Sequence, residues 1–185
     1  LYGEAYAVAI DDYIAGSDGV SNTLDGLAGN DTLVAGDSGD FLFGGSGDDS
    51  LVGGSGADLL SGDEGNDTLR GGEGADTYSI DVVTQDANGD GLSSGHDVIE
   101  GFTDGDVLEL YSFGPGAAVT ISLEHVGNDT ILTLGAGTSY ESTVTLQNYH
   151  LDNSALPQNG TFEGNFSLYG EAYAVAIDDY IAGSD

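Results

Sequence analysis

Large apolar residues recur every nine positions along residues 26–79 of this 185-residue chain. Each occupies the eighth place of a nine-residue unit: Leu33, Leu42, Leu51, Leu60, Leu69 and Tyr78. Six such units follow one another without an insertion. Glycine is concentrated in the first four places, and repeated glycine indicates backbone with positive φ or a close approach to a ligand. The pattern predicts a short strand, x-U-x with U the large apolar residue, after each Gly-rich turn.

This period predicts an all-β fold in which two units form one coil of eighteen residues. Stacked coils make two facing parallel sheets. We expect one ladder of Leu33, Leu51 and Leu69 and a facing ladder of Leu42, Leu60 and Tyr78. Each strand is too short to be stable alone, so the coils must stack to bury a continuous core. A disordered Gly/Asp-rich tract is the alternative, and it is favoured when metal is absent.

An Asp stands at the sixth position of every unit: Asp31, Asp40, Asp49, Asp58, Asp67 and Asp76. Stacking places the carboxylates of alternate units over one another. These like charges oppose folding unless a cation is held between them. Oxygen donors in a flexible turn suit Ca²⁺ better than Mg²⁺, and a chain with no Cys and three scattered His is a poor fit for zinc or iron. The pattern therefore predicts bound Ca²⁺.

The units resemble the RTX nonapeptide repeat, GGxGxDxUx, which is a calcium-binding β-helix signature. The third, fourth and sixth units match it in full. The other units depart from it at Leu27, Ala35, Ser38 and Asp63. The resemblance implies a right-handed parallel β-roll, with about four to six Ca²⁺ ions held between turns two units apart.

The same resemblance implies the ligands. One turn supplies the carbonyl oxygens of its second and fourth positions and its Asp. The next turn on that side supplies the carbonyl oxygens of its first and third positions and its Asp. The candidates, unit by unit, are Leu27, Gly29 and Asp31; Gly36, Ser38 and Asp40; Gly44, Gly45, Ser46, Gly47 and Asp49; Gly53, Gly54, Ser55, Gly56 and Asp58; Gly62, Asp63, Glu64, Gly65 and Asp67; and Gly71, Gly72, Glu73, Gly74 and Asp76.

Two degenerate units precede the repeats. Asp12 and Asn22 stand before triplets centred on Ile14 and Leu24, which we expect to extend the two ladders. Residues 1–14 fit both the alternation of a strand and the apolar face of a helix. The strand is favoured, because Asp12 already begins a D-x-U-x segment.

Residues 86–97 fit a twelve-residue EF-hand-like loop. Its candidate ligands are Asp86, Asn88, Asp90 and Asp97. No helical pattern flanks the loop, so a solvated turn is the alternative. The resemblance to RTX proteins implies a rival role for Asp97, in which it closes the last site of the roll with Gly72, Gly74 and Asp76.

Residues 96–110 resemble the segment that caps RTX rolls. Its apolar residues would cover the open end of the core: Val98, Ile99, Phe102, Val107, Leu108 and Leu110. Three antiparallel strands are predicted to follow, at residues 119–123, 130–134 and 144–147, with turns at 127–129 and from 135.

The first eighteen residues, 1–18, recur without change at 168–185. The simplest interpretation is one module followed by the start of an identical one, and a strand appended to complete the fold is the alternative. The predicted organisation is an N-terminal segment with degenerate repeats (1–25), the β-roll (26–79), a β cap with an acidic loop (80–150), a linker (151–167) and the start of the next module (168–185).

Charge narrows the function classes. The chain has 33 acidic residues and one basic residue, Arg70, for a formal net charge of −32. Such a surface repels nucleic acid and anionic lipid. No apolar run is long enough to span a membrane, so we expect no membrane insertion. Without Cys, Ca²⁺ would take the place of disulfides in rigidifying an extracellular fold.

No HExxH motif is found, and we do not expect an enzyme. The resemblance implies type I secretion to the extracellular space or cell surface. We expect a Ca²⁺-folded structural or adhesive module of a tandem array, filament or surface layer, with identical modules as partners. The alternative is a carbohydrate-binding accessory module of a secreted enzyme, facing a glycan or a cell surface. Ice binding would need regular Thr and Asn rows, which the third and fifth positions do not supply.

Overall fold

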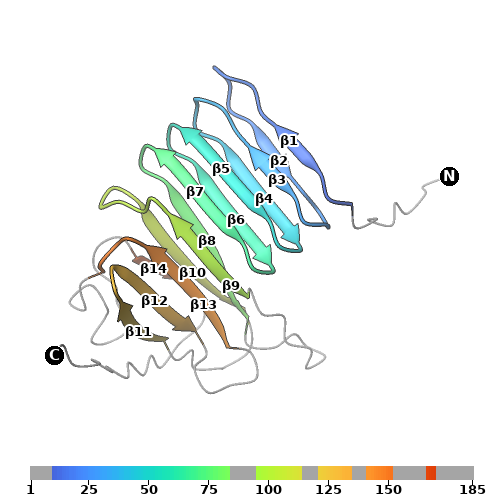
Figure 1. The fold of residues 1–185 in the computed structure, drawn as a ribbon. Coiled ribbons are helices and arrows are strands. Elements are labelled where there is room, and N and C mark those ends of the chain that lie inside the picture. Colours follow the sequence, from blue (N-terminus) through green and yellow to red (C-terminus); the bar gives the residue numbers. More distant parts are fainter. Residues whose placement is uncertain (1–9, 84–94, 114–120, 135–140, 152–165, 170–185) are drawn as a thin grey trace.

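The structure is a computed structural model that describes residues 10–83, 95–113, 121–134, 141–151 and 166–169. Every regular element in these ranges is a β-strand, which confirms the predicted all-β class. No helix among the described residues is long and apolar enough to cross a membrane. The strands form a flattened roll of stacked coils, and a hairpin lies beside its C-terminal end (Figure 1).

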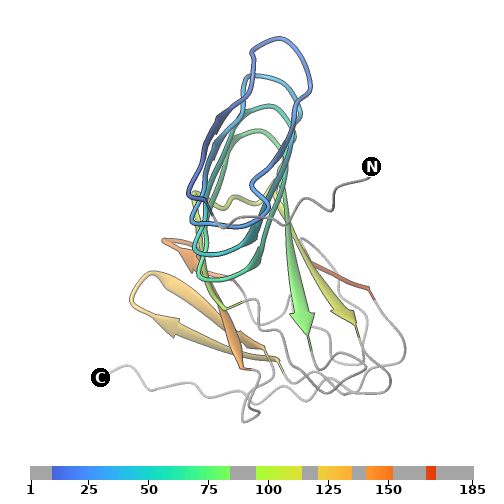
Figure 2. The same ribbon diagram turned by 90° about the vertical axis from the view of Figure 1, so that its right-hand side faces the viewer.

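Ten strands of the roll alternate between two sheets. One side holds β1 (Tyr13–Ala15), β3 (Thr32–Val34), β5 (Ser50–Ser55), β7 (Thr68–Glu73) and β9 (His96–Glu100). The other side holds β2 (Thr23–Asp25), β4 (Phe41–Ser46), β6 (Leu59–Glu64), β8 (Thr77–Val83) and β10 (Val107–Phe113). Neighbouring strands within each side are parallel. Figure 2 shows the coils as nested loops, with the two sheets facing one another.

The register stacks the eighth-position residues as predicted. One ladder contains Ile14, Leu33, Leu51, Leu69 and Ile99, and the facing ladder contains Leu24, Leu42, Leu60, Tyr78 and Leu108. All except Ile14 are buried. Because the flanking residues of each triplet point outward, one large side chain per unit fills the space between the sheets.

The roll continues past Tyr78, where the nine-residue pattern is interrupted. Asp97 follows Asp76 by twenty-one positions, and the spacing then returns to nine between Asp97 and Asp106. β9 pairs with β7 and β10 pairs with β8, so Ile99 and Leu108 occupy the next places in the two ladders.

Residues 96–100 and 107–110 are therefore strands of the roll, and four of the expected core-covering residues are buried: Ile99, Phe102, Leu108 and Leu110. Val98 and Val107 stand at the outward-facing seventh position and are only half-buried. Three aromatic rings pack together in this region. The ring of Phe102 lies 5.7 Å from that of Tyr78 and 4.9 Å from that of Tyr149, centroid to centroid.

The predicted antiparallel strands are β11 (Ile121–Val126), β12 (Asp129–Leu134) and β13 (Ser142–Gln147). β13 pairs in parallel with β9, so the hairpin continues an eight-stranded sheet in the order β1-β3-β5-β7-β9-β13-β12-β11. Gly127, with a φ of 67°, begins the tight turn between β11 and β12. The turn predicted from residue 135 lies outside the described residues.

The second sheet has six strands in the order β14-β10-β8-β6-β4-β2. Its last strand, β14 (Phe166–Tyr169), pairs in parallel with β10 and spans the predicted boundary between the linker and the repeated segment. The remainder of the linker beyond residue 151, residues 1–9 and residues 170–185 lie outside the described part of the chain.

Candidate metal centre

The turns between strands stack along two edges of the roll, and the sixth-position residues form a ladder on each edge. One ladder contains Asp12, Asp31, Asp49, Asp67 and Asp97, and the other contains Asn22, Asp40, Asp58, Asp76 and Asp106. Each backbone N–H donates to the Oδ1 atom of the residue one coil further on, at 2.6–3.1 Å. The stacking of carboxylates inferred from the period is therefore present in the structure.

The second carboxylate oxygen of five ladder residues is buried without a hydrogen-bond partner. These atoms are Oδ2 of Asp31, Asp49, Asp58, Asp67 and Asp76. The five residues expose only 1–3% of their surface. A buried carboxylate oxygen without a donor is costly, and a bound cation supplies the missing partner.

First-position glycines allow these oxygens to approach the backbone closely. A Cβ atom added to Gly44 would collide with Oδ2 of Asp49 and would lie 2.8 Å from the carbonyl oxygen of Gly62 in the next coil. A Cβ atom added to Gly53 would likewise collide with Oδ2 of Asp58 and would lie 2.7 Å from the carbonyl oxygen of Gly71. A carboxylate oxygen from one coil and a carbonyl oxygen from the next therefore lie beside the same glycine, and oxygen atoms of these two kinds are the ligands of a hard cation.

Side chains alone do not complete such a site. Within the described residues, no three His, Cys, Asp or Glu side chains are grouped so as to hold a metal. Backbone carbonyls must supply the remaining ligands, as the RTX resemblance implies. In the first predicted site, Ser46 N–H donates to the Leu27 carbonyl at 3.0 Å, and Gly29 N–H donates to the Ser46 carbonyl at 2.9 Å.

These bonds hold the two turns together and leave each carbonyl oxygen a second lone pair. The arrangement is compatible with carbonyl coordination of Ca²⁺. The complete ligand set stays a prediction: Leu27, Gly29, Asp31, Gly44, Ser46 and Asp49 for the first site, with equivalent sets in the later units.

Burial raises the pKa of the ladder carboxyls. It raises the pKa of Asp49 and Asp58 to about 6, that of Asp67 to about 7 and that of Asp97 to about 8. Desolvation is the largest cause, the backbone N–H bonded to each carboxylate opposes it, and neighbouring carboxylates add to it. These carboxyls therefore need protons or a cation to stay buried, and Ca²⁺ supplies both a countercharge and a ligand for Oδ2.

Asp97 lies on a different edge from the one predicted for it. Its carboxylate accepts the backbone N–H of Asp67 at 3.1 Å, whereas the RTX resemblance placed it with Asp76. The partner of Asp76 is Asp106, which accepts its N–H at 2.9 Å and was not among the candidates. The spacing carried the signal, because Asp97 and Asp106 both begin D-x-U-x segments nine residues apart. The other EF-hand-like candidates, Asp86, Asn88 and Asp90, lie outside the described residues.

In five of the six repeat units, the second position of the turn adopts a positive φ. Gly45, Gly54 and Gly72 have φ angles of 104–111°, and the non-glycine residues Leu27 and Asp63 are held at 69° and 67°. An L-residue in this region costs about 1–2 kcal/mol. The carbonyl is unaffected by the side chain, so both substitutions remain compatible with coordination through the backbone.

A further ladder, which sequence reasoning missed, runs along one edge only. The fifth-position side chains of Asp11, Asn30, Asp48 and Asn66 accept the backbone N–H of the fifth-position residue one coil further on, at 2.8–3.1 Å. These bonds run in the direction opposite to those of the Asp ladder, so each coil is tied to its neighbours in both directions. On the other edge, Gly39, Ala57 and Ala75 offer no side-chain acceptor, and the hydroxyl of Ser21 donates to the Gly39 carbonyl oxygen at 2.6 Å.

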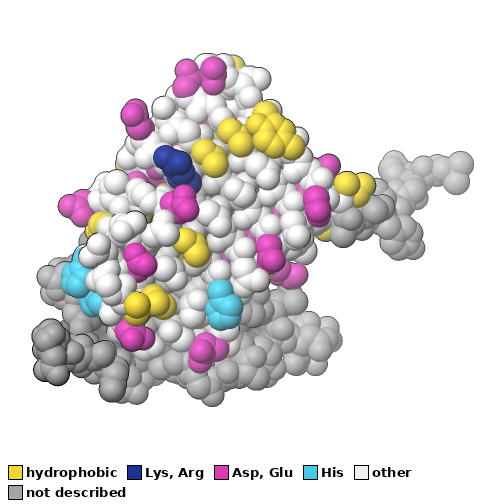
Figure 3. All heavy atoms as spheres, viewed as in Figure 1, with side chains coloured by type: hydrophobic (Ala, Val, Ile, Leu, Met, Phe, Trp, Pro, Cys, Tyr) yellow, Lys and Arg dark blue, Asp and Glu magenta, His cyan; other side chains and the backbone are white. Residues whose placement is uncertain are grey.

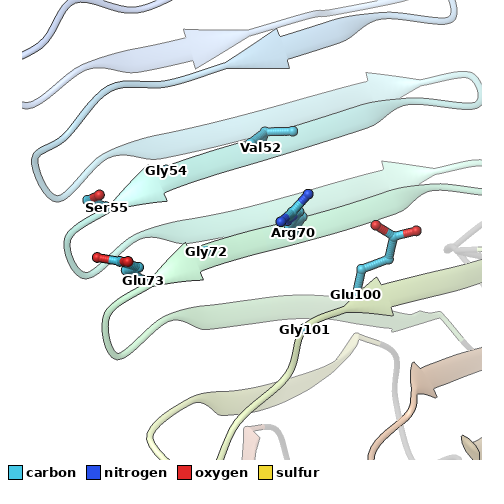
Figure 4. A pocket seen from close by; sticks show the side chains of 8 residues that line it. All are labelled: Val52, Gly54, Ser55, Arg70, Gly72, Glu73, Glu100 and Gly101. Carbon is cyan, nitrogen blue, oxygen red and sulfur yellow. The ribbon is translucent and has the colours of Figure 1, made fainter.

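The outer surface is strongly acidic. Figure 3 shows carboxylate side chains spread over one face of the molecule around a single basic group. That group, Arg70, lines a surface pocket with Val52, Ser55, Glu73 and Glu100 (Figure 4). Two carboxylates border the same pocket as the guanidinium, so the pocket has no charge pattern that selects an anionic ligand.

Two overlapping segments, residues 18–51 and 43–78, match the family described as the RTX calcium-binding nonapeptide repeat (4 copies). No curated protein matches the chain. Two solution structures of repeat subunits from the Azotobacter vinelandii mannuronan C5-epimerase are similar. The AlgE6R3 subunit is 22% identical with a TM-score of 0.39, over 97% of this chain and 97% of that one. The AlgE6R2 subunit is 23% identical with a TM-score of 0.43, over 91% of this chain and 98% of that one.

The stacked parallel coils and the buried Asp ladders define a β-roll whose turns bind calcium. The chain carries RTX calcium-binding nonapeptide repeats at residues 18–78, as the sequence pattern indicated. This assignment rests on the repeats and on the strands of this chain itself.

Proposed function

We propose that this chain is a structural or adhesive module that Ca²⁺ folds outside the cell, as one member of a tandem array in a large secreted bacterial protein. The observation that carries the proposal is the set of five buried Oδ2 atoms without partners. Because these carboxylates need a cation before their burial is favourable, folding of the roll is coupled to metal binding.

The net charge supports a chain that is expanded in the cytosol and folded outside the cell. At a net charge of −32 the metal-free chain resists compaction. Five Ca²⁺ ions, within the predicted four to six, would add ten positive charges and leave about −22. Low cytosolic Ca²⁺ would keep the chain expanded for type I export, and millimolar external Ca²⁺ matches the weak affinities of extracellular modules.

The repeated segment supports the array. Residues 1–18 and 168–185 are identical, so a further module of the same sequence is the natural partner. A tandem arrangement, a filament or a surface layer would each bring many copies together at the cell surface.

The proposal assigns no catalytic role to the three histidines. His96 Nδ1 lies 2.9 Å from Thr143 Oγ1, and His125 Nε2 lies 3.0 Å from the Leu151 carbonyl oxygen. The rings of His125 and His150 stack with centroids 3.7 Å apart. These ring contacts are to a hydroxyl, to backbone and to each other.

A carbohydrate-binding accessory module is the second candidate. Phe41 is 46% exposed on the outer face of the six-stranded sheet, paired in register with Leu59 of β6. An exposed ring on a flat sheet can stack on a neutral sugar. Saturable binding of a neutral polysaccharide by the wild-type chain, lost in Phe41→Ala, would favour this function.

The test of the first proposal is a Ca²⁺ titration of the protein after EDTA treatment, followed by far-UV circular dichroism and light scattering. A cooperative gain of β signal near millimolar Ca²⁺, absent with Mg²⁺, is expected, and calorimetry should count four to six ions. Growth of scattering with the β signal would favour a self-assembling layer or filament over a monomeric module. A chain fully folded without Ca²⁺ would refute the proposal.

A further inference from the structure

The C-terminal edge of the six-stranded sheet is occupied by a strand that belongs to two modules. β14 pairs in parallel with β10 in the register Leu108 to Phe166, Glu109 to Ser167, Leu110 to Leu168 and Tyr111 to Tyr169. Leu168 and Tyr169 are also the first two residues of the segment that repeats residues 1–18. The strand therefore joins the last residues before the repeat to the first residues within it.

We propose that the first residues of each following module complete the six-stranded sheet of the module before it. In a tandem array, the first two residues of a module, Leu and Tyr, would form the second half of a strand that pairs with β10 of the module before it. This inference rests on the proposed tandem function and names the partner, the next module of the same chain, and the place where it binds, the edge of β10 that faces away from β8.

The opposite end of the roll is consistent with a continuous assembly. β2 is the other terminal strand of the same sheet, and every pair in this sheet is parallel, so all its strands have one direction. Near this end Tyr13 is 71% exposed and Ile10 is 54% exposed, and Ile14 is only partly buried. Unpaired edges and exposed apolar groups are liabilities that a neighbouring module would cover.

The spacing leaves little chain between modules. Tyr180 to Ala182 repeat the sequence of β1, and only residues 170–179 separate them from β14. Ten extended residues span at most about 35 Å. No further domain fits in that length, so one roll would begin where the previous one ends.

The experiment compares Leu168→Pro and Tyr169→Pro with Leu1→Pro and Tyr2→Pro, in the 185-residue chain at saturating Ca²⁺. The second pair is a matched control, because it changes the same dipeptide in the first copy. Alternate residues of a parallel strand bond to a given neighbour, so one of the two substitutions in β14 removes a hydrogen bond to β10. That variant should accelerate amide hydrogen exchange at residues 108–111 by about tenfold or more and lower the Tm by several degrees.

Unchanged exchange in both β14 variants would overturn the inference, as would equal effects from the two controls. Either result leaves the proposed function intact if the wild-type chain still gains β structure with Ca²⁺. A wild-type chain that gains no β signal with Ca²⁺ would overturn the proposed function and this inference together.

Discussion

The fifth and sixth positions of the turns give acidic residues opposite environments. Asp67, at the sixth position, is 1% exposed, and burial raises its pKa to about 7. Asp48, at the fifth position, is exposed, and hydrogen bonds from Asn66 lower its pKa. The place in the turn, and not the type of residue, therefore decides which carboxylate needs a cation.

We expect Asp67→Asn to raise the Ca²⁺ concentration at the folding midpoint by about tenfold or more. The reason is that Asp67 lies in the ladder between Asp49 of the coil before it and Asp97 of the coil after it. Without Ca²⁺ the same variant should be more ordered than wild type, since a neutral amide avoids the cost of a buried charge. Circular dichroism during a Ca²⁺ titration measures both effects.

Asp48→Asn is the control, because it removes one charge and keeps the Oδ1 acceptor for Asn66. It should leave the midpoint nearly unchanged. An equal shift in both variants would mean that net charge, and not the ladder, sets the Ca²⁺ requirement.

At the scale of the strand, two adjacent leucines of β6 lie on opposite faces of the sheet, one in the core and one at the surface. Leu60 of β6 is fully buried in the ladder, and Leu59 beside it is partly exposed on the outer face. Leu60→Ala should lower the free energy of unfolding by about 2–5 kcal/mol, and Leu59→Ala by about 1 kcal/mol or less. Denaturant unfolding at fixed Ca²⁺ tests this difference, and similar losses would contradict the assigned faces.

The strand triplets could be predicted from the sequence, because side chains alternate along a strand. A buried apolar residue therefore has an outward-facing residue on each side of it. The strands of the middle coils extend further than the triplets. β4 continues to Ser46, since Gly45 pairs with Asp63 and Ser46 with Glu64 across the turn. Glycine content indicates a turn but does not reveal that turns two units apart also form a ladder of backbone bonds.

Two features escaped prediction for different physical reasons. β9 and β10 follow an interruption of the period, and a one-dimensional pattern does not show that the chain returns to the same ladder after an insertion. The fifth-position ladder of Asp11, Asn30, Asp48 and Asn66 was missed because these side chains bond to backbone one coil away. Only one edge carries it, so the two edges must be compared separately.

For the whole molecule, pH and Ca²⁺ act on the same groups. Folded-state pKa values of about 6 for Asp49 and Asp58, about 7 for Asp67 and about 8 for Asp97 lie above the ordinary Asp value of 3.8. The folded state then binds more protons than the unfolded state. The stability that these four carboxyls contribute to the metal-free folded state is therefore fully present below about pH 4. It is lost as the pH rises through their folded-state pKa values.

The metal-free protein should consequently keep more β signal at pH 4 than at pH 8, and the Ca²⁺ midpoint should rise as pH falls because protons compete with the ion. Circular dichroism with EDTA and with Ca²⁺ across this range measures both trends. A metal-free chain that is more ordered at pH 8 than at pH 4 would contradict the assigned pKa shifts.

The strands lie across the long axis of the roll, with β1 at one end and β14 at the other (Figure 1). Tension applied through the two ends would therefore peel the outermost coil first, because each coil contacts only its neighbours. The hydrogen bonds and Ca²⁺ ions of one coil would be loaded at a time. Such a chain would lengthen in small steps under load and recoil when slack, and the surrounding Ca²⁺ concentration would set the force at which each step occurs.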